Sequence, residues 1–194
     1  GQNNSAPAIG GMQIQTSNYG APVPIVYGQT RISTNLMWYG GFQAIAQTTQ
    51  QASGGKGGAP SSSNTTYTYQ ASIQMGLCEG PISGIGTIWV GKATETAAAL
   101  AIQIFTGTYP QSPWSYLTSN FPGQDLGYAG VAHIDAANYP LDNSASLPNH
   151  SFEVLGRLQY GGGIVDSNPA DVINDLLTNP NYGCGFPPSM IGDL

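Results

Sequence analysis

The chain has 194 residues, of which only four are Lys or Arg and ten are Asp or Glu, so its formal net charge is −6. So few basic residues exclude the positive face that nucleic-acid binding requires, and the lack of an apolar run of about 18 residues excludes a membrane-spanning helix. Disorder is excluded as well, because disordered chains are usually highly charged and poor in aromatic residues, whereas this chain is 7% charged and has 11 Tyr, 5 Phe and 3 Trp.

Alternating apolar and polar residues predict a mainly β protein. The clearest strand covers residues 67–77, where Tyr67, Tyr69 and further apolar residues alternate with polar residues or glycine. This period of two places one face on a core and the other toward water or a partner. Between turn-forming residues, shorter strands are predicted at 12–16, 25–27, 32–38, 42–47, 85–90, 131–134 and 152–155. The order of elements favours antiparallel pairing with one or two short helices.

Three other segments complete the predicted architecture. Residues 52–65 have the Gly- and Ser-rich composition of a flexible loop. Residues 94–105 are ambiguous, because their Ala run favours a helix and their AIQIF sequence favours a strand. Residues 167–180 predict a helix with Asn168 as N-cap and Pro169 in the first helical position. Its apolar residues Val172, Ile173, Leu176 and Leu177 form one stripe.

The segment GTIWVGKA, residues 86–93, matches a phosphate-binding loop except that Ala93 stands where Ser or Thr would bind magnesium. The residues between its glycines are β-branched or aromatic, which indicates a strand instead of a Gly-rich loop. We interpret it as the second strand of a β-hairpin whose first strand is 67–77, with Gly91 and Lys92 in the turn at its far end. The sequence predicts no cofactor and no metal site.

The remaining reactive residues have structural interpretations. His133 would share a strand face with Asp135 as a surface pair, and His150 stands in a turn-like entry to a strand. A spatial Ser-His-Asp arrangement stays open, since such triads are not sequential. Cys78 and Cys184 are predicted to be single buried thiols instead of a disulfide. The predicted protein is therefore not an enzyme.

Five segments, in order, resemble the central hub proteins of long-tailed phage tails, a family of tail-tip, host-specificity and baseplate-hub proteins that includes those of gene transfer agents. They are SNYGAPVPIVYGQTRI (17–32), GGKGG (54–58), YTYQASIQMGLCEGPISGIGTIWVGK (67–92), LPNHSFEVLG (147–156) and NPADVINDLLTNPNYGCGFP (168–187). The resemblance implies a structural role in the virion, made in the bacterial host, as a homotrimeric ring at the end of the tail tube. Other tail proteins would be its partners, and genomic DNA would pass through its channel without specific binding.

The resemblance also implies how the chain is organised. Residues 1–165 would form an antiparallel β-barrel or sandwich, a tube-like hub domain, and residues 166–194 would lead into or pack with a further hub domain. Because family members are longer, the chain is expected to be a fragment or a truncated copy. A neutral surface that partner proteins cover agrees with this role. Candidate interface or structural residues are Arg31, Lys56, Tyr67, Tyr69, Gln70, Gln74, Glu79 and Trp89.

Two other functions remain open at the level of the sequence. Trp38, Trp89, Trp114 and Tyr116 offer rings on which sugars stack, which would suit a carbohydrate- or receptor-binding β-module. His133 or His150 would instead serve a hydrolase that acts on the cell envelope.

Overall fold

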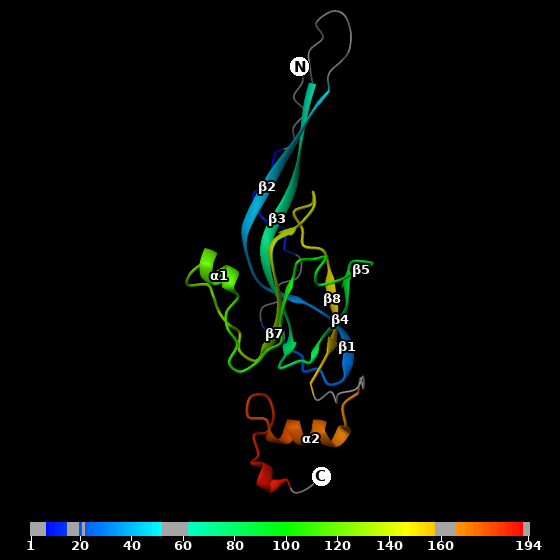
Figure 1. The fold of residues 1–194 in the computed structure, drawn as a ribbon, viewed down its shortest axis with the longest axis vertical. Coiled ribbons are helices and arrows are strands. Elements are labelled where there is room, and N and C mark those ends of the chain that lie inside the picture. Colours follow the sequence, from blue (N-terminus) through cyan, green and yellow to red (C-terminus); the bar gives the residue numbers. More distant parts are fainter. Residues whose placement is uncertain (1–6, 15–19, 21, 52–61, 158–165, 192–194) are drawn as a thin grey trace, which may run out of the picture.

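The computed structural model describes residues 7–14, 20, 22–51, 62–157 and 166–191, and it is mainly β, as predicted. Two antiparallel four-stranded sheets make up the body, and a small helix lies at one side and a longer one at the C-terminal end (Figure 1). In chain order, the elements are β1 (Gln29–Ser33), β2 (Asn35–Gln51), β3 (Ser62–Glu79), β4 (Gly84–Val90), β5 (Ala93–Glu95), β6 (Gln103–Phe105), α1 (Ser115–Asn120), β7 (Val131–Pro140), β8 (His150–Leu155), α2 (Pro169–Thr178) and the 3-10 turn η1 (Pro188–Met190).

The first sheet has the strand order β2-β3-β7-β6 and contains the longest strands. The strand predicted at 67–77 is part of β3, which also takes in the end of the segment predicted as a loop. The strand predicted at 42–47 lies within β2, which also contains most of the one predicted at 32–38. The β2–β3 ladder crosses a bulge between Gly40 and Gln43, where Gly41 adopts a φ of 62°. A bulge accommodates such an irregularity without ending the ladder, which explains why one strand continues through the glycines.

The second sheet has the order β1-β8-β4-β5, and it corrects the hairpin interpretation of residues 86–93. β4 pairs with β8 and β5, whereas β3 belongs to the first sheet. The chain leaves the first sheet after Glu79, where Gly80 packs against the backbone of Gly107 and Pro81 has no amide hydrogen to continue a ladder. Gly91 and Lys92 do form a two-residue turn, but it joins β4 to β5.

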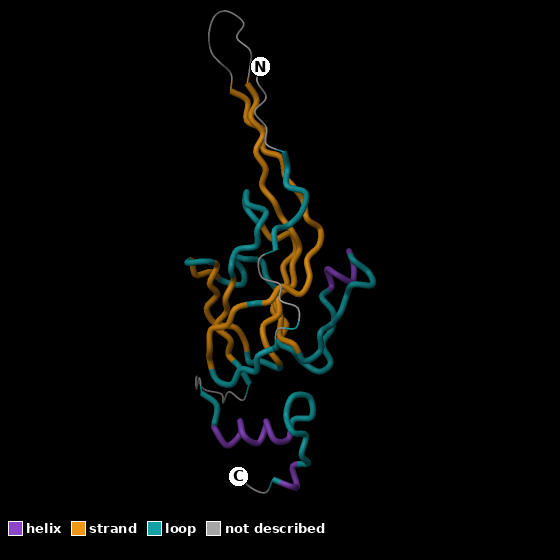
Figure 2. The backbone as a smooth tube through the Cα atoms, turned by 180° about the vertical axis from the view of Figure 1, so that it is seen from behind, coloured by secondary structure: helices purple, strands orange, loops and turns teal. Residues whose placement is uncertain are grey.

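The hydrophobic core contains residues of both sheets. Alternate residues of β8 point into it, so that Phe152 and Val154 are fully buried, as is Ile73 of β3. Ile134 of β7 and Ile88 of β4 are also buried. Figure 2 shows the molecule from behind, where the strands form the body and the helices lie at its margins. Burial of one face of each sheet fixes the pairing register.

Other expected elements differ from the prediction. Residues 25–27 contribute only isolated bridges, at Ile25 and Tyr27, and 12–16 only one, at Gln13, with residues 15 and 16 outside the described part. Residues 94–105 contain no helix and supply β5 and β6 to different sheets. Helix α1 was not predicted. Helix α2 was predicted, with Asn168 as its N-cap. The Asn168 side chain accepts a hydrogen bond from the Ala170 amide at 3.0 Å.

The polar face of β3 does not point to water or to a partner along its whole length. Ser72 and Gln74 are fully buried, because the segment that carries α1 covers this part of the sheet. Ser72 donates a hydrogen bond to the Tyr116 hydroxyl at 2.9 Å, and Trp38 packs edge-on against Phe121 with ring centroids 5.0 Å apart. A second layer over the sheet is a tertiary feature that the alternation of β3 did not reveal.

Candidate interaction surface

A two-stranded ribbon, which we call the β2–β3 arm and define as residues 45–51 and 62–68, extends from the body (Figure 1). Its strands pair from Ile45↔Thr68 to Gln51↔Ser62, and Figures 1 and 2 show it projecting from the body. Seven residue pairs correspond to a length of roughly 20 Å. None of its residues is charged, and residues 45–50 are all exposed. The arm is thus a neutral extension that the body does not cover.

Aromatic packing fixes the arm at its root. The rings of Phe42 and Tyr69 are stacked with centroids 5.7 Å apart, and the buried Tyr69 hydroxyl accepts a hydrogen bond from the Ile9 amide at 3.0 Å. Across the ladder, the Gln70 side chain donates to the Gln43 side chain at 2.9 Å. Of the predicted interface residues, Tyr69 is therefore an anchor of the fold, while Tyr67 and Gln70 remain partly accessible.

The edges of the arm carry the features of a protein-binding element. β2 is the terminal strand of its sheet, and β7 pairs with β3 only from Gln70 onward. Long edge strands without charge or proline are templates for pairing with another chain, and an isolated two-stranded hairpin is only marginally stable in water. The arm is therefore suited to contact with a second protein surface, by strand addition or by packing on its faces.

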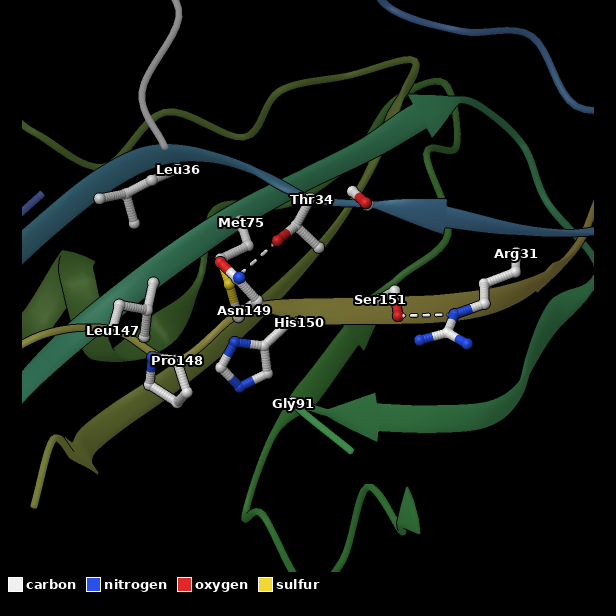
Figure 3. Close-up of a pocket in the computed structure, with 11 residues that line it drawn as sticks. Arg31, Thr34, Leu36, Met75, Gly91, Leu147, Pro148, Asn149, His150 and Ser151 are labelled. Carbon is white, nitrogen blue, oxygen red and sulfur yellow. Dashed lines mark hydrogen bonds between the residues drawn. The ribbon is translucent and has the colours of Figure 1, made fainter. Parts of the chain in front are cut away.

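Arg31 of β1 and Trp89 of β4 lie on the two strands that flank β8 in the second sheet, and their side chains meet across it. The Arg31 guanidinium carbon is 4.0 Å from the centroid of the Trp89 ring, and its Nε donates to the Ser151 hydroxyl at 2.8 Å. Arg31 and Ser151 also line a cavity of about 340 Å³, together with residues from the start of β2 and the loop before β8 (Figure 3). This second surface is separate in the fold from the arm root.

Gln74 lies inside the protein, in a polar cluster with His133 and Asp135. All three are at most 1% exposed. Asp135 accepts hydrogen bonds from Gln74 Nε2 at 3.1 Å and, through its other oxygen, contacts His133 Nδ1 at 2.9 Å. Phe105 stacks on the His133 ring at 4.5 Å. The expected surface pair is thus a buried pair, because the β6–α1 segment folds over this end of β7.

Glu79 ends β3 near a second polar cluster, centred on Asp175 of α2. Arg157 contacts the Asp175 carboxylate at 3.5 Å and donates to the Gly80 carbonyl, while the Tyr27 hydroxyl donates to Asp175 at 2.6 Å and Tyr182 also donates to it. Burial alone would raise the pKa of Asp175, but the hydrogen bonds from Tyr182 and Tyr27 and the charge of Arg157 outweigh it and lower the pKa.

The same contacts affect the two tyrosines. Burial and the hydrogen bond to Asp175 raise the pKa of Tyr27 to about 12, and the same two causes raise the pKa of Tyr182. The cluster attaches α2 to the β body. The sequence analysis did not predict this cluster. Because the chain has only four basic residues, an ion pair between Arg157 and one of the ten acidic residues could have been expected.

The candidate interface residues do not form one site. Tyr67, Tyr69 and Gln70 lie at or near the arm root, Arg31 and Trp89 on the second sheet, Gln74 in the core and Glu79 at the opposite end of β3. Lys56 falls outside the described residues.

The residues considered for chemistry are engaged in structural contacts. His150 is buried, and its Nε2 lies 2.8 Å from the Tyr139 hydroxyl; burial lowers its pKa, an effect that the Pro148 backbone partly offsets. Cys78 is buried, and burial followed by the charge of Glu79 raises the pKa of its thiol to about 12. Cys184 is exposed, so the prediction of a buried thiol is wrong for this residue. Both thiols are free, as predicted.

Sugar-stacking platforms receive little support from the aromatic residues. Trp114 is 3% exposed, Arg31 covers a face of Trp89, and Trp38 packs on Phe121 and donates to the Gln124 side chain at 2.8 Å. Among the described residues, no group of three or more His, Cys, Asp or Glu side chains is arranged to hold a metal, and none of the helices described has the length and apolar character needed to cross a bilayer.

Comparison with known proteins gives a likeness of fold. No protein-family model matches the chain, and no curated protein matches it significantly. Among solved structures, the fold resembles that of a protein chain in a virus-like particle. That structure is described as the virion of a native gene transfer agent particle, and the superposition has a TM-score of 0.55 at 18% sequence identity. It covers 82% of this chain but only 32% of the other, so this chain spans about a third of the length of its structural neighbour.

Proposed function

We propose that this protein is a structural component of a phage-type tail, built into a ring at the tail tip or baseplate hub. The observation that carries the proposal is the likeness of 82% of the chain to a chain of a gene transfer agent virion. The five ordered segments that resemble tail-tip hub proteins support the same assignment. On this proposal the ring is a homotrimer that closes the tail tube, carries the host-contacting parts and binds neighbouring tail proteins.

The β2–β3 arm supports an assembled state. It is a neutral ribbon, to which none of the other described strands pairs along residues 45–51 or 62–68, on a chain whose net charge is −6. Identical acidic subunits repel one another, and a contact surface without charge, such as the arm, adds no close pairs of like charge to that repulsion. A two-stranded ribbon is stable only when a third strand or another element packs against it. A neighbouring copy of the chain would supply that contact to the arm.

The remaining composition agrees with a channel wall. Proteins bind DNA when their Lys and Arg side chains replace the counterions of the phosphates. A channel lined by this chain, which has four basic and ten acidic residues, would therefore not retain DNA. DNA would therefore pass through the ring without specific binding. Residues 166–194 would begin the contact with a further hub domain, to which α2 presents the exposed Ile173 and Leu176.

The test is self-association of the chain at increasing concentration, measured by sedimentation equilibrium for the wild type and the Ile45→Asp variant. Ile45 lies on the arm with 41% of its surface exposed. A carboxylate there should weaken assembly at least tenfold, because an interface that buries an unpaired charge loses more than about 1.4 kcal/mol.

The matched control is Leu126→Asp, which adds the same charge to an apolar side chain that is 60% exposed and lies outside the arm. It should assemble like the wild type. A wild-type chain that stays monomeric at every concentration, or two variants that behave alike, would contradict the role of the arm in assembly.

A further inference from the structure

We propose that Arg31 is a docking residue for an acidic side chain of a second copy of this chain, which would enter the cavity that Arg31 helps to line. This inference rests on the proposed self-assembly and names a contact at a surface other than the β2–β3 arm. It is carried by four features of the described residues: the pairing of the cations, the position of Glu153, the fixation of the guanidinium and the shape of its surroundings.

The first feature is that the described cations are used differently. Arg157 contacts Asp175 and is committed to attaching α2. Arg31 is exposed, and the ion pairs found among the described residues do not include it. Arg31 and Lys92 are thus the described cations outside these ion pairs, and of the two Arg31 is the one that lines a cavity.

The second feature is that a carboxylate lies next to Arg31 and is occupied elsewhere. Glu153 is the residue directly opposite Arg31 in the β1–β8 ladder. Its carboxylate accepts instead from the Thr87 amide at 2.9 Å and from the Gln29 side chain. These hydrogen bonds, that from the Thr87 backbone first, lower the pKa of Glu153. Glu153 is thereby held in a different contact, and the ion pairs among the described residues do not join it to Arg31.

The third feature is that the Arg31 guanidinium is fixed before any ligand arrives. Trp89 supports its face at 4.0 Å and Ser151 accepts from its Nε at 2.8 Å. A guanidinium loses less conformational entropy on binding when its orientation is already set. Its two terminal nitrogens can then meet the two oxygens of a carboxylate in the bidentate arrangement that favours arginine.

The fourth feature is the cavity itself, about 340 Å³ in volume. Figure 3 shows Arg31 and Ser151 at one side of it and Leu147, Pro148 and His150 at the other. Hydroxyl and amide groups of Ser33, Thr34 and Asn149 add hydrogen-bonding capacity to the lining, and Leu36 and Met75 add an apolar part. The space fits the end of a side chain with an apolar stem and a carboxylate head.

The charge of the molecule selects a protein carboxylate over other anions. A nucleic acid would need several cations along one surface, whereas Arg31 and Lys92 are the two exposed cations among the described residues. Copies of this chain carry an excess of acidic groups and are the partner that the proposed ring supplies. The contact would also relieve part of the repulsion between copies whose net charge is −6 each.

The experiment compares self-association of the wild type with that of Arg31→Gln, by sedimentation equilibrium in about 50 and 500 mM salt. Lys92→Gln is the matched control, because it makes the same change of net charge at an exposed cation in the β4–β5 turn. We expect the dissociation constant to rise about tenfold for Arg31→Gln and less than twofold for Lys92→Gln. High salt should reduce the difference between the wild type and Arg31→Gln.

Three outcomes would overturn the proposal. Equal effects of the two variants would mean that only net charge matters. Normal association of Arg31→Gln, together with loss of association in Ile45→Asp, would leave the assembly of the chain standing and reject Arg31. Quenching of Trp fluorescence by added malonate in the wild type but not in Arg31→Gln, without any effect of Arg31→Gln on association, would assign the cavity to a small carboxylate.

Discussion

At the scale of single residues, the few charges of this chain are placed with particular consequence. Asp175 brings Tyr27, Arg157 and Tyr182 together although they are far apart in the sequence. α2 has no buried residue of its own, so this polar cluster supplies much of what holds the helix against the β body. Charged hydrogen bonds of this kind stabilise a fold more than neutral ones do.

Substitution Asp175→Asn should therefore lower the free energy of unfolding by about 1.5–3 kcal/mol. The pKa of Asp175 is lower in the folded protein than its ordinary value of 3.8, so the charged form stabilises the fold. That stabilisation is complete above pH values near the ordinary pKa and is lost as the pH falls through the lower folded-state value. Urea unfolding of the wild type and the variant at pH 7 and at acid pH measures both effects.

Asp166→Asn is the control for this prediction, because Asp166 is exposed and precedes the helix. Its stability should differ from that of the wild type by less than about 0.5 kcal/mol. Equal stability of Asp175→Asn and the wild type at pH 7 would show that the cluster does not stabilise the attachment of α2.

At the scale of elements, the change of sheet between β3 and β4 decides the topology. Gly80 follows β3, and a Cβ added to it would lie 2.5 Å from both the Gly107 Cα and the Thr106 carbonyl oxygen. Those atoms belong to the segment that follows β6, which the Ile82 amide also joins by donating to the Thr106 carbonyl at 2.9 Å. The crossing is thus a close backbone approach that only glycine permits.

Gly80→Ala should destabilise the protein by about 2–3 kcal/mol, because rigid backbone atoms would have to move apart. Gly84→Ala in β4 is the matched control, since its Cβ would meet nothing nearer than a Leu155 methyl group at 3.9 Å. That variant should be neutral or stabilised by about 0.5 kcal/mol. Thermal unfolding compares the two, and equal melting temperatures would refute the close-approach argument.

At the scale of the whole molecule, the stability of the chain is expected to be uneven. The part of β3 from Ala71 to Cys78 is nearly all buried, whereas the β2–β3 arm has few apolar contacts and open edges. Backbone hydrogen bonds in such exposed ribbons open without global unfolding. On the proposed function, assembly would protect the arm by covering it.

Hydrogen exchange tests this expectation. In the monomer, amides of residues 45–50 should exchange with opening free energies of about 0–2 kcal/mol, while those of Ile73 and Met75 should approach the global value. Raising the protein concentration into the assembled range should slow exchange in the arm. Amides of residues 132–136 serve as the internal control, because β7 is already buried. Arm amides that exchange slowly in the monomer would contradict the picture of a bare ribbon.

Local elements with a short-range signal could be predicted from the amino-acid sequence. The alternation from Tyr67 to Leu77 predicted β3, and the Asn168–Pro169 start predicted α2, because side-chain period and capping depend on neighbours in the chain. Gly91 and Lys92 were correctly predicted as a turn. The β-strand nature of GTIWV followed from its β-branched and aromatic residues, which also excluded a phosphate-binding loop.

The pairing of the strands and the burial of polar residues could not be predicted in this way, because both depend on contacts between distant parts of the chain. β4 pairs with β8 and β5 and not with β3. Ser72 and Gln74 are buried, although their alternation is the same as that of a solvent-exposed face. Arg31 likewise contacts Ser151 and Trp89 and forms no ion pair with Glu153, and these neighbours meet only because their strands share a sheet. Such contacts join residues distant in the chain, and their energies depend on the assembled surroundings instead of on local sequence.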